Sequence, residues 1–184
     1  MSGHSVLVIS GTNRPQANAM KIARLVEGHY RQLGVPVELF SLSELPAETF
    51  DPRSYAEKPA SFKAIQQRVL EAGGLHLVTP EYNGSFPGIL KYFIDMLKFP
   101  ESFDRKPVAF IGEAAGNWGA LRAVEQLQMV FGYRNAHIYP ERVFIPNVTE
   151  KLDSDGQLLD ASLAERLAKQ AKGFAEYCRC LIAR

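Results

Sequence analysis

The sequence of 184 residues predicts a three-layer α/β fold, in which a parallel sheet lies between two layers of helices. Two observations support this prediction. Five short runs rich in β-branched residues alternate with longer stretches of helical periodicity, and three of these runs are almost entirely apolar. Strands of that kind are buried on both faces, as in a parallel sheet covered by helices. Strict alternation of strand and helix also implies right-handed crossovers.

The first half of the chain accounts for three of the strands and two of the helices. Asn18 can cap the first helix and Gly34 can end it, whereas the second helix begins near Ser61 and ends at Gly73. Apolar side chains recur on one face of each helix. Residues 44–60 hold three prolines and no clear period, so we predict a surface loop there. The strands are predicted over residues 6–10, 35–40 and 75–79.

The second half adds two strands and three helices. Asp153-Ser154-Asp155-Gly156 resembles a calcium-binding loop only superficially, because the glycine and the later ligands stand at the wrong positions, and we predict a turn. Five strands in this arrangement suit the flavodoxin-like order 2-1-3-4-5, and we expect a single domain over residues 1–184. The remaining strands are predicted over 108–112 and 136–145, and the helices over about 88–99, 119–133 and from 161 to the C-terminus.

Composition excludes several classes of protein. An apolar fraction of 46% and a charged fraction of 22% are ordinary for globular chains and exclude disorder over most of the length. A net charge of +1 gives no reason to expect a nucleic-acid partner. The sequence contains no run of 18 apolar residues, so we expect no membrane span, and the apolar run at residues 6–10 is too short for a signal peptide. Two cysteines do not make a disulfide scaffold, so we expect a cytoplasmic enzyme or binding domain.

The loop after the first strand has the features of an anion site. In an open α/β sheet, ligands bind at the carboxyl ends of the strands, and the amino end of the following helix attracts phosphate. Gly11 permits a sharp exit from the strand, Thr12 and Asn18 offer short polar side chains, and Arg14 offers a fixed positive charge. The loop matches neither a Walker A motif nor G-x-G-x-x-G. The alternative is an ordinary capped loop with an exposed arginine.

The loop after the third strand, residues 79–88, has the same placement across the sheet. It holds two prolines and two glycines in ten residues, which fix an unusual backbone. Such a loop can direct several backbone N–H groups at the edge of one planar ligand. Tyr82 and Phe86 add aromatic surface. We therefore favour a ligand-binding loop over a rigid surface turn.

Together these two loops carry a family resemblance. Gly11-Thr12-Asn13-Arg14 with Asn18, followed by the run from Pro80 to Lys91 and by Asp95, resembles the NADPH-dependent FMN reductase family. These are flavodoxin-like flavoproteins that include chromate, quinone and azo-dye reductases. The resemblance continues through residues 142–146 and covers most of the chain. It implies non-covalent FMN, NADPH or NADH as co-substrate, a small-molecule electron acceptor, and a homodimer or homotetramer.

The resemblance also assigns the residues of the site by position. The loop after the fourth strand, residues 113–119, would close the third side of the flavin pocket. In the family that loop commonly shows two adjacent glycines before the helix, whereas this chain has Trp118-Gly119. By this resemblance, the phosphate group would be held by Thr12, Arg14 and Asn18, with Gly11 in the same cofactor-binding loop. The isoalloxazine ring would be lined by Pro80, Glu81, Tyr82, Asn83 and Ser85, with Gly84 in the same loop, and the closing loop would contribute Ala115, Gly116 and Trp118.

The resulting hypothesis is an FMN-dependent NAD(P)H oxidoreductase in which hydride passes from the nicotinamide to FMN and then electrons pass to a quinone, free flavin or similar acceptor, by a ping-pong mechanism. No side chain is required as acid or base. The four histidines are scattered, so no metal site is expected. The alternative is a flavin-binding electron carrier or redox sensor without NAD(P)H turnover. Such carriers tend to be acidic, and the net charge of +1 favours the enzyme.

The third helix bears on assembly. In residues 89–97 only Lys91 and Asp95 are charged, four positions apart on an otherwise apolar helix. A surface helix of a monomer is apolar on one face only. We therefore expect this helix to pack against another subunit.

Overall fold

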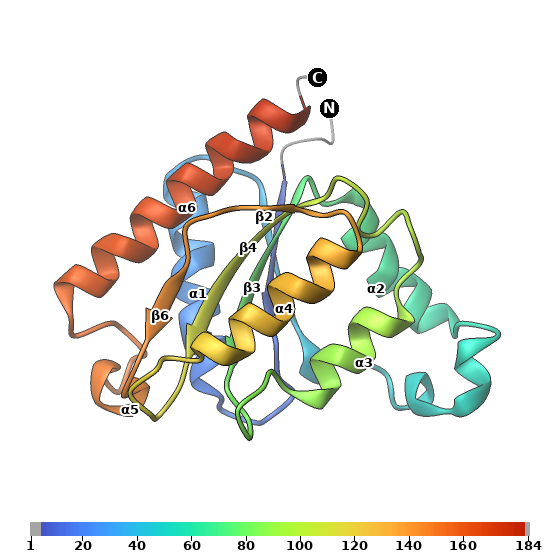
Figure 1. The fold of residues 1–184 in the computed structure, drawn as a ribbon, viewed down its shortest axis with the longest axis horizontal. Coiled ribbons are helices and arrows are strands. Elements are labelled where there is room, and N and C mark those ends of the chain that lie inside the picture. Colours follow the sequence, from blue (N-terminus) through green and yellow to red (C-terminus); the bar gives the residue numbers. More distant parts are fainter. Residues whose placement is uncertain (1–4, 183–184) are drawn as a thin grey trace.

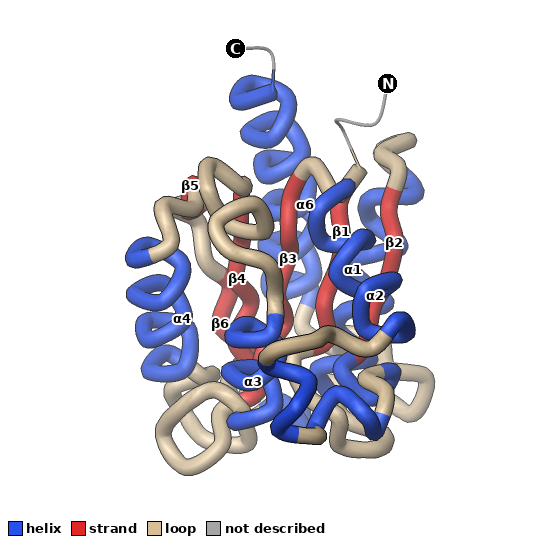
Figure 2. The backbone as a smooth tube through the Cα atoms, turned by 90° about the vertical axis from the view of Figure 1, so that its right-hand side faces the viewer, coloured by secondary structure: helices blue, strands red, loops and turns tan. Residues whose placement is uncertain are grey.

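A computed structural model of the chain describes residues 5–182. Its centre is a six-stranded, all-parallel sheet whose strands follow the order β2-β1-β3-β4-β5, with β6 also paired to β4. Helices cover both faces of this sheet (Figures 1 and 2). The predicted α/β class and strand order are confirmed. The strands are β1 (Val6–Ser10), β2 (Val37–Ser41), β3 (Gly74–Pro80), β4 (Pro107–Glu113), β5 (His137–Ile138) and β6 (Val143–Ile145).

Each face of the sheet has its own core. α1 (Asn18–Gln32) and α6 (Ala161–Ile182) pack on one face, and α2 (Ala60–Glu71), α3 (Gly88–Met96) and α4 (Leu121–Tyr133) pack on the other. Residues of β1, β3 and β4 alternate between the two cores because successive side chains of a strand point to opposite faces. Both faces being covered explains why these strands read as continuous apolar runs.

The predicted fifth strand, residues 136–145, is wrong in its continuity. The structure has two short strands there, β5 beside the start of β4 and β6 beside its end. Pro140 stands between them and has no N–H group to donate to the ladder, so pairing with β4 cannot continue through it. The side chain of Gln170 donates to the carbonyl oxygen of Glu141 instead, at 2.9 Å.

The boundaries of α1 correct one prediction and agree with another. Asn18 does not cap the helix: it is the first helical residue, the capping position is Ala17, and no side chain accepts a hydrogen bond there. Gly34 does follow the end of the helix, with a φ of +67° that favours glycine. α4 begins two residues later than predicted, because Gly119 and Ala120 both adopt left-handed backbone before it.

The two irregular segments are more ordered than the sequence suggests. Residues 44–60 were predicted as a surface loop, but three single-turn 3₁₀ helices occupy residues 42–55. Thr49 and Ser54 are buried there, and the hydroxyl of Tyr92 donates to the carbonyl of Thr49 at 2.7 Å. The second irregular segment, residues 146–160, contains a short helix, α5 (Val148–Lys151), followed by the predicted turn at residues 153–156. In that turn the Asp153 carboxylate accepts the backbone N–H groups of residues 155 and 157.

The parallel strands place three loops at one edge. β1, β3 and β4 run in the same direction, so the loops that follow them, residues 11–17, 81–87 and 114–120, gather at the lower end of the sheet in Figure 1. Both described termini lie at the opposite end. Within residues 5–182, the helices are each too short or too polar to cross a membrane.

Candidate functional site

A pocket of about 440 Å³ lies where these three loops meet. Its volume falls within the usual range of small-molecule sites. The start of α5 forms the remaining wall. The lining residues are Arg14, Pro15, Gln16, Ala17 and Asn18 from the first loop, Pro80, Glu81 and Tyr82 from the second, Glu113, Ala114 and Ala115 from the third, and Val148 and Thr149.

The pocket brings together some of the predicted site residues and leaves others behind it. All three predicted loops contribute, which is the arrangement that the sequence predicted. Other predicted residues do not line the pocket, and several of them hold its loops in place. The predicted residues that line it are Arg14, Asn18, Pro80, Glu81, Tyr82 and Ala115; those outside the lining are Gly11, Thr12, Asn83, Gly84, Ser85, Gly116 and Trp118.

One end of the pocket is suited to an anion. The amino end of α1 opens toward it, with no side-chain cap and no acidic residue in the first helical turn. The first N–H groups of a helix lack partners within the helix, and the helix dipole makes this end positive. Arg14 adds a positive charge beside them. These features fit a phosphate group.

Thr12 and Gly11 connect this end to the second loop. The Thr12 hydroxyl accepts the backbone N–H of Arg14 at 3.2 Å and shares a hydrogen bond of 3.0 Å with the hydroxyl of Tyr82. Gly11 donates its N–H to the carbonyl of Val78 at 2.8 Å. A Cβ at Gly11 would lie 3.0 Å from that carbonyl oxygen and from the Leu90 side chain, so the close approach of this loop to β3 and α3 favours glycine.

The second loop is a tight hairpin. The backbones of Tyr82 and Ser85 exchange two hydrogen bonds, of 2.7 and 3.1 Å. Asn83 and Gly84 form the turn between them with φ values of +54° and +75°. Two left-handed residues in a two-residue turn are typical of an Asn-Gly hairpin, so these residues fix the shape of the loop rather than contact the pocket.

Gln126 of α4 holds this hairpin from outside, and sequence reasoning missed it. Its side-chain oxygen accepts the hydroxyl of Ser85, and its amide nitrogen donates to the carbonyl of Gly84 at 3.3 Å. A glutamine in the middle of an amphipathic helix carries no sequence signal for this role, because its partners lie about forty positions away.

The third loop is tied to the segment after β6. Ala114 donates to the carbonyl of Ile145 at 3.1 Å, and Gly116 accepts the N–H of Asn147 at 3.2 Å. Trp118 is 67% exposed and stands outside the pocket lining. Its indole is therefore accessible to solvent at the rim of this loop.

Two carboxyl groups line the pocket. Burial raises the pKa of Glu113 to about 7, while the backbone amide of Ala19 and the charge of Arg14 act in the opposite direction. Glu113 begins the predicted closing loop 113–119 but was assigned no role of its own, although a single charge at the end of the apolar run 108–112 was a usable signal. Glu81 has a buried carboxyl oxygen, Oε2, with no hydrogen-bond partner among the described residues. A buried polar atom left without a partner at a pocket indicates a place for a ligand group.

The rest of the pocket suits a flat, partly polar molecule. The rigid hairpin offers backbone and the Tyr82 ring along one side, and the third loop faces it. A phosphate at α1 and a flat ring between these loops correspond to the two ends of FMN. The residues present therefore fit this cofactor.

Comparisons with known proteins agree with this geometry. The family model for NADPH-dependent FMN reductase matches residues 4–150. The chain is 30% identical over 151 residues to an NAD(P)H-dependent FMN reductase of Pseudomonas aeruginosa, covering 80% of this chain and 81% of that protein. It is 32% identical over 114 residues to an FMN-dependent NADPH-azoreductase of Staphylococcus aureus, covering 60% of each.

A solved structure extends the match over nearly the whole chain. FerB, a flavoenzyme NAD(P)H:(acceptor) oxidoreductase from Paracoccus denitrificans, superposes with a TM-score of 0.75 at 26% identity, over 96% of this chain and 97% of FerB. The family match covers the three loops of the pocket described above. The chain therefore belongs to the NADPH-dependent FMN reductase family, whose cofactor is FMN and whose reductant is a reduced nicotinamide nucleotide.

Proposed function

We propose that this protein is an FMN-dependent NAD(P)H oxidoreductase that reduces a quinone, a free flavin or a similar small acceptor by a ping-pong mechanism. The observation that supports it best is the single pocket that joins an anion site at α1 to a rigid hairpin. A single FMN-binding domain over residues 1–184 would carry this activity. A cytoplasmic location, which both free cysteines favour, is part of the proposal.

The chain's own residues would bind and orient the cofactor. Arg14 and the first amides of α1 would hold the phosphate, with Asn18 beside them. Pro80, Glu81 and Tyr82 would line the ring, on a hairpin whose shape residues 83–85 fix. When bound, FMN supplies the two-electron chemistry between the nicotinamide and the acceptor. The protein contributes position, because the Thr12–Tyr82 hydrogen bond joins the first two loops and the Gln126 contacts hold the second loop against α4.

Steady-state kinetics test the activity. The holoprotein should oxidise NADPH or NADH in the presence of a quinone, and double-reciprocal plots at several quinone concentrations should be parallel, because both substrates use one site in turn. Intersecting lines would contradict the ping-pong mechanism but not the reductase. A protein that binds FMN and shows no NAD(P)H oxidation with any acceptor would favour the electron-carrier alternative.

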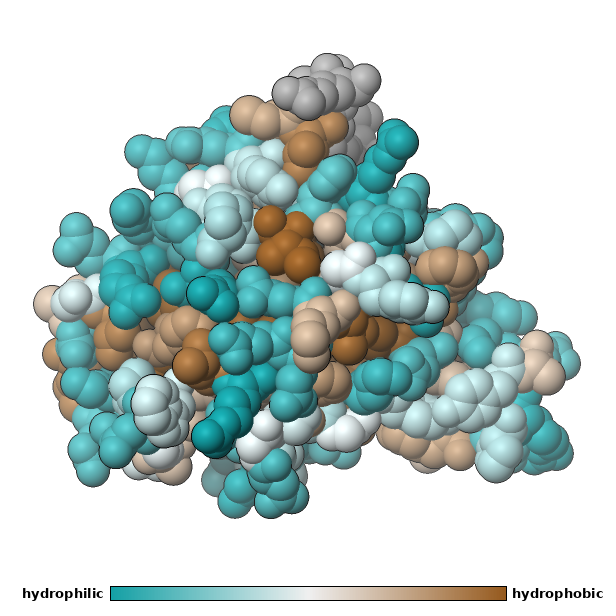
Figure 3. All heavy atoms as spheres, viewed as in Figure 1, coloured by the Kyte–Doolittle hydropathy of each residue, from teal (hydrophilic) through white to brown (hydrophobic). Residues whose placement is uncertain are grey.

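We also propose that the protein is a homodimer or homotetramer. The sequence predicts that the apolar residues of α3 pack against another subunit. That prediction is wrong for Leu90, Phe93, Ile94 and Met96, which are buried within the chain itself. Apolar surface remains in the groove between α3 and α4, where Met129 is 69% exposed, and Figure 3 shows apolar residues in this band. The groove, of about 440 Å³, is lined by Phe86, Lys91, Ile94, Asp95, Gln126, Met129, Val130, Tyr133 and Arg134.

A second copy of this chain suits the groove as its occupant. Apolar side chains line the groove, and it also carries Arg134 and the Lys91–Asp95 ion pair of 2.7 Å, which give it the mix of apolar and charged groups typical of a subunit interface. Light scattering should give two or four times the 20.5 kDa of one chain. Met129→Glu should lower that mass, whereas Leu159→Glu, a charge at an exposed leucine outside the groove, should leave it unchanged. A wild-type mass of 20.5 kDa at micromolar concentration would contradict the proposal.

A further inference from the structure

Glu113 places a carboxyl group inside the anion end of the flavin pocket. It is the last residue of β4 and is 5% exposed. Ala109 and Ile111, at alternate positions of the same strand, pack in the core that contains α1, so Glu113 faces α1 as well. Its backbone is held firmly, since its carbonyl accepts the N–H of Glu81 at 3.2 Å.

The carboxyl group of Glu113 meets the amino end of α1 from the sheet. That helix has no capping side chain of its own and no acidic residue in its first turn. Glu113 lines the same pocket as Ala17 and Asn18 at the start of this helix, and the backbone amide of Ala19, in the first turn, acts to lower the pKa of its carboxyl group. The helix end to which a phosphate is attracted therefore already faces a carboxyl group of the chain.

Near neutral pH both forms of this carboxyl are populated. Burial raises the pKa of Glu113 to about 7, against the effects of the Ala19 amide and the Arg14 charge. The other ionisable residues among those that line the pocket are Arg14 on the first loop and Glu81 and Tyr82 on the second. The wall from α5 contributes Val148 and Thr149, neither of which ionises.

We propose that Glu113 controls flavin binding through the phosphate: its neutral form admits the phosphate at the start of α1, and its ionised form opposes it. The neutral carboxyl can donate a hydrogen bond to a phosphate oxygen. The ionised carboxylate places a negative charge beside the phosphate, which itself carries nearly two negative charges, so the two groups repel each other. The inference rests on the proposed function, because it takes FMN as the cofactor of this pocket.

The sign of the pH dependence follows from linkage. A bound phosphate disfavours the charged form of Glu113, so its pKa is higher in the complex than in the free protein and binding takes up a proton. FMN affinity therefore falls as pH rises through the pKa of the free protein. Riboflavin has the same ring and no phosphate, so its affinity lacks this fall.

Titration of the apoprotein with the two flavins tests the proposal. Quenching of flavin fluorescence gives the Kd at about pH 6 and about pH 8, at constant ionic strength. FMN affinity should fall about fivefold or more between these values, which corresponds to a pKa increase of about one unit on binding, whereas riboflavin affinity should change less than about twofold. Glu113→Gln should abolish the fall and bind FMN more tightly than wild type at the higher pH.

Glu150→Gln is the matched control. Glu150 is an exposed carboxylate on α5, outside the pocket lining, so its removal changes net charge equally and should keep the wild-type pH dependence. ¹³C NMR of the carboxyl groups in wild-type protein provides a second measurement that needs no variant: FMN, and not riboflavin, should raise the pKa of Glu113.

The outcomes separate this inference from the function on which it rests. An equal pH dependence for FMN and riboflavin, or a fall in FMN affinity that persists in Glu113→Gln, would overturn the role of Glu113 and leave the FMN enzyme intact. Failure of wild-type protein to bind FMN at either pH would overturn the proposed function, and the role of Glu113 with it.

Discussion

At the scale of single residues, Arg14 is the charge that the proposed function places at the FMN phosphate. It lines the anion end of the pocket next to uncapped helix amides. Arg14→Ala should weaken FMN binding by about 1–3 kcal/mol, the usual contribution of a charge-assisted hydrogen bond, and should leave riboflavin binding nearly unchanged. Arg24→Ala, an exposed arginine further along α1, is the control. Equal loss for both flavins would mean that Arg14 supports the fold of the loop instead of the phosphate.

Trp118 is the only tryptophan in the chain, so its fluorescence reports on one place. It is 67% exposed on the loop that forms the third wall of the pocket. If that loop closes over the flavin, as the family resemblance implies, FMN added to apoprotein should quench the indole emission saturably, with one flavin per chain. Trp118→Gly should then alter the KM for the acceptor more than FMN affinity, because the phosphate end is untouched. Unchanged emission during demonstrable FMN binding would place the indole away from the ring.

At the scale of elements, the hairpin and its support from α4 make a separate prediction. Gln126→Ala removes both side-chain hydrogen bonds to residues 84 and 85, and should weaken binding of FMN and riboflavin alike by about 0.5–1.5 kcal/mol. Both flavins share the ring that the proposed function places beside the hairpin, so the loss should not depend on the phosphate. Gln128→Ala, on the same helix but bonded to Arg142, should bind as wild type does. A loss confined to FMN would contradict this assignment.

The elements also show what sequence could predict. Buried strands and loops rich in glycine and proline have local signatures, so the strand order was predicted correctly and the three predicted loops do meet at one pocket. The interruption at Pro140 could have been read from the sequence, since proline cannot continue a ladder. Gln126 could not, because its role depends on the distance between α4 and a loop that only tertiary packing sets. Glu113 stood at a visible position, but its raised pKa is a consequence of burial.

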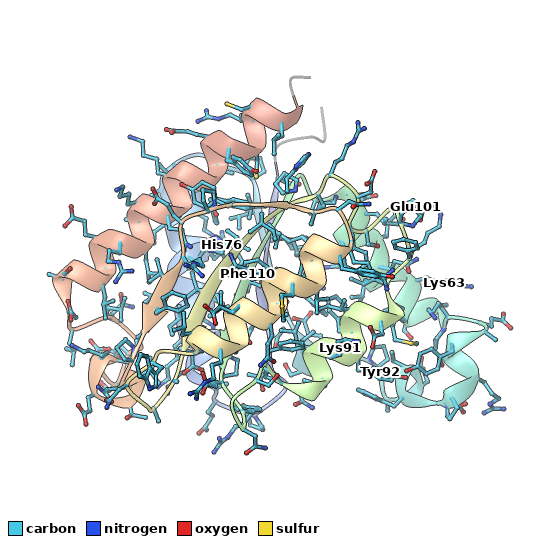
Figure 4. The ribbon with its side chains drawn as sticks, viewed as in Figure 1. Lys63, His76, Lys91, Tyr92, Glu101 and Phe110 are labelled. Atoms are coloured by element: carbon cyan, nitrogen blue, oxygen red, sulfur yellow. The ribbon has the colours of Figure 1, made fainter. Side chains whose placement is uncertain are left out.

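At the scale of the whole molecule, His76 connects both helices of one layer through the sheet. It is fully buried in β3 (Figure 4), where its Nδ1 shares a hydrogen bond of 2.7 Å with Tyr30 of α1 and its Nε2 lies 3.3 Å from the side-chain oxygen of Gln170 of α6. Gln170 in turn donates to the carbonyl of Phe110 in β4 at 3.0 Å. Desolvation lowers the pKa of His76 to about 4, so the folded protein holds it neutral over most of the pH range.

This network predicts how stability depends on pH. The unfolded chain protonates His76 near pH 6.5 and the folded chain only near 4, so its contribution is complete above about 6.5 and is lost as pH falls between these values. The loss should reach about 2 kcal/mol by about pH 5. Glu113 acts oppositely, because its pKa is raised and its contribution is present at low pH and lost as pH rises through about 7.

The two effects partly cancel in wild-type protein, so the difference between proteins is what isolates His76. Urea unfolding of wild type and of His76→Gln should be compared at about pH 7 and about pH 5. The variant should be less stable at the higher pH, since glutamine replaces a ring that fits this core, but the gap should narrow by about 2 kcal/mol at the lower pH, because the variant has no group to protonate there. Glu113→Gln should have the opposite effect: its stability should rise relative to that of wild type as pH increases from about 5 to about 7, because it has no carboxyl group to ionise. A gap that stays constant between the two pH values would show that His76 titrates alike in the folded and unfolded chain, and that the buried network does not hold it neutral.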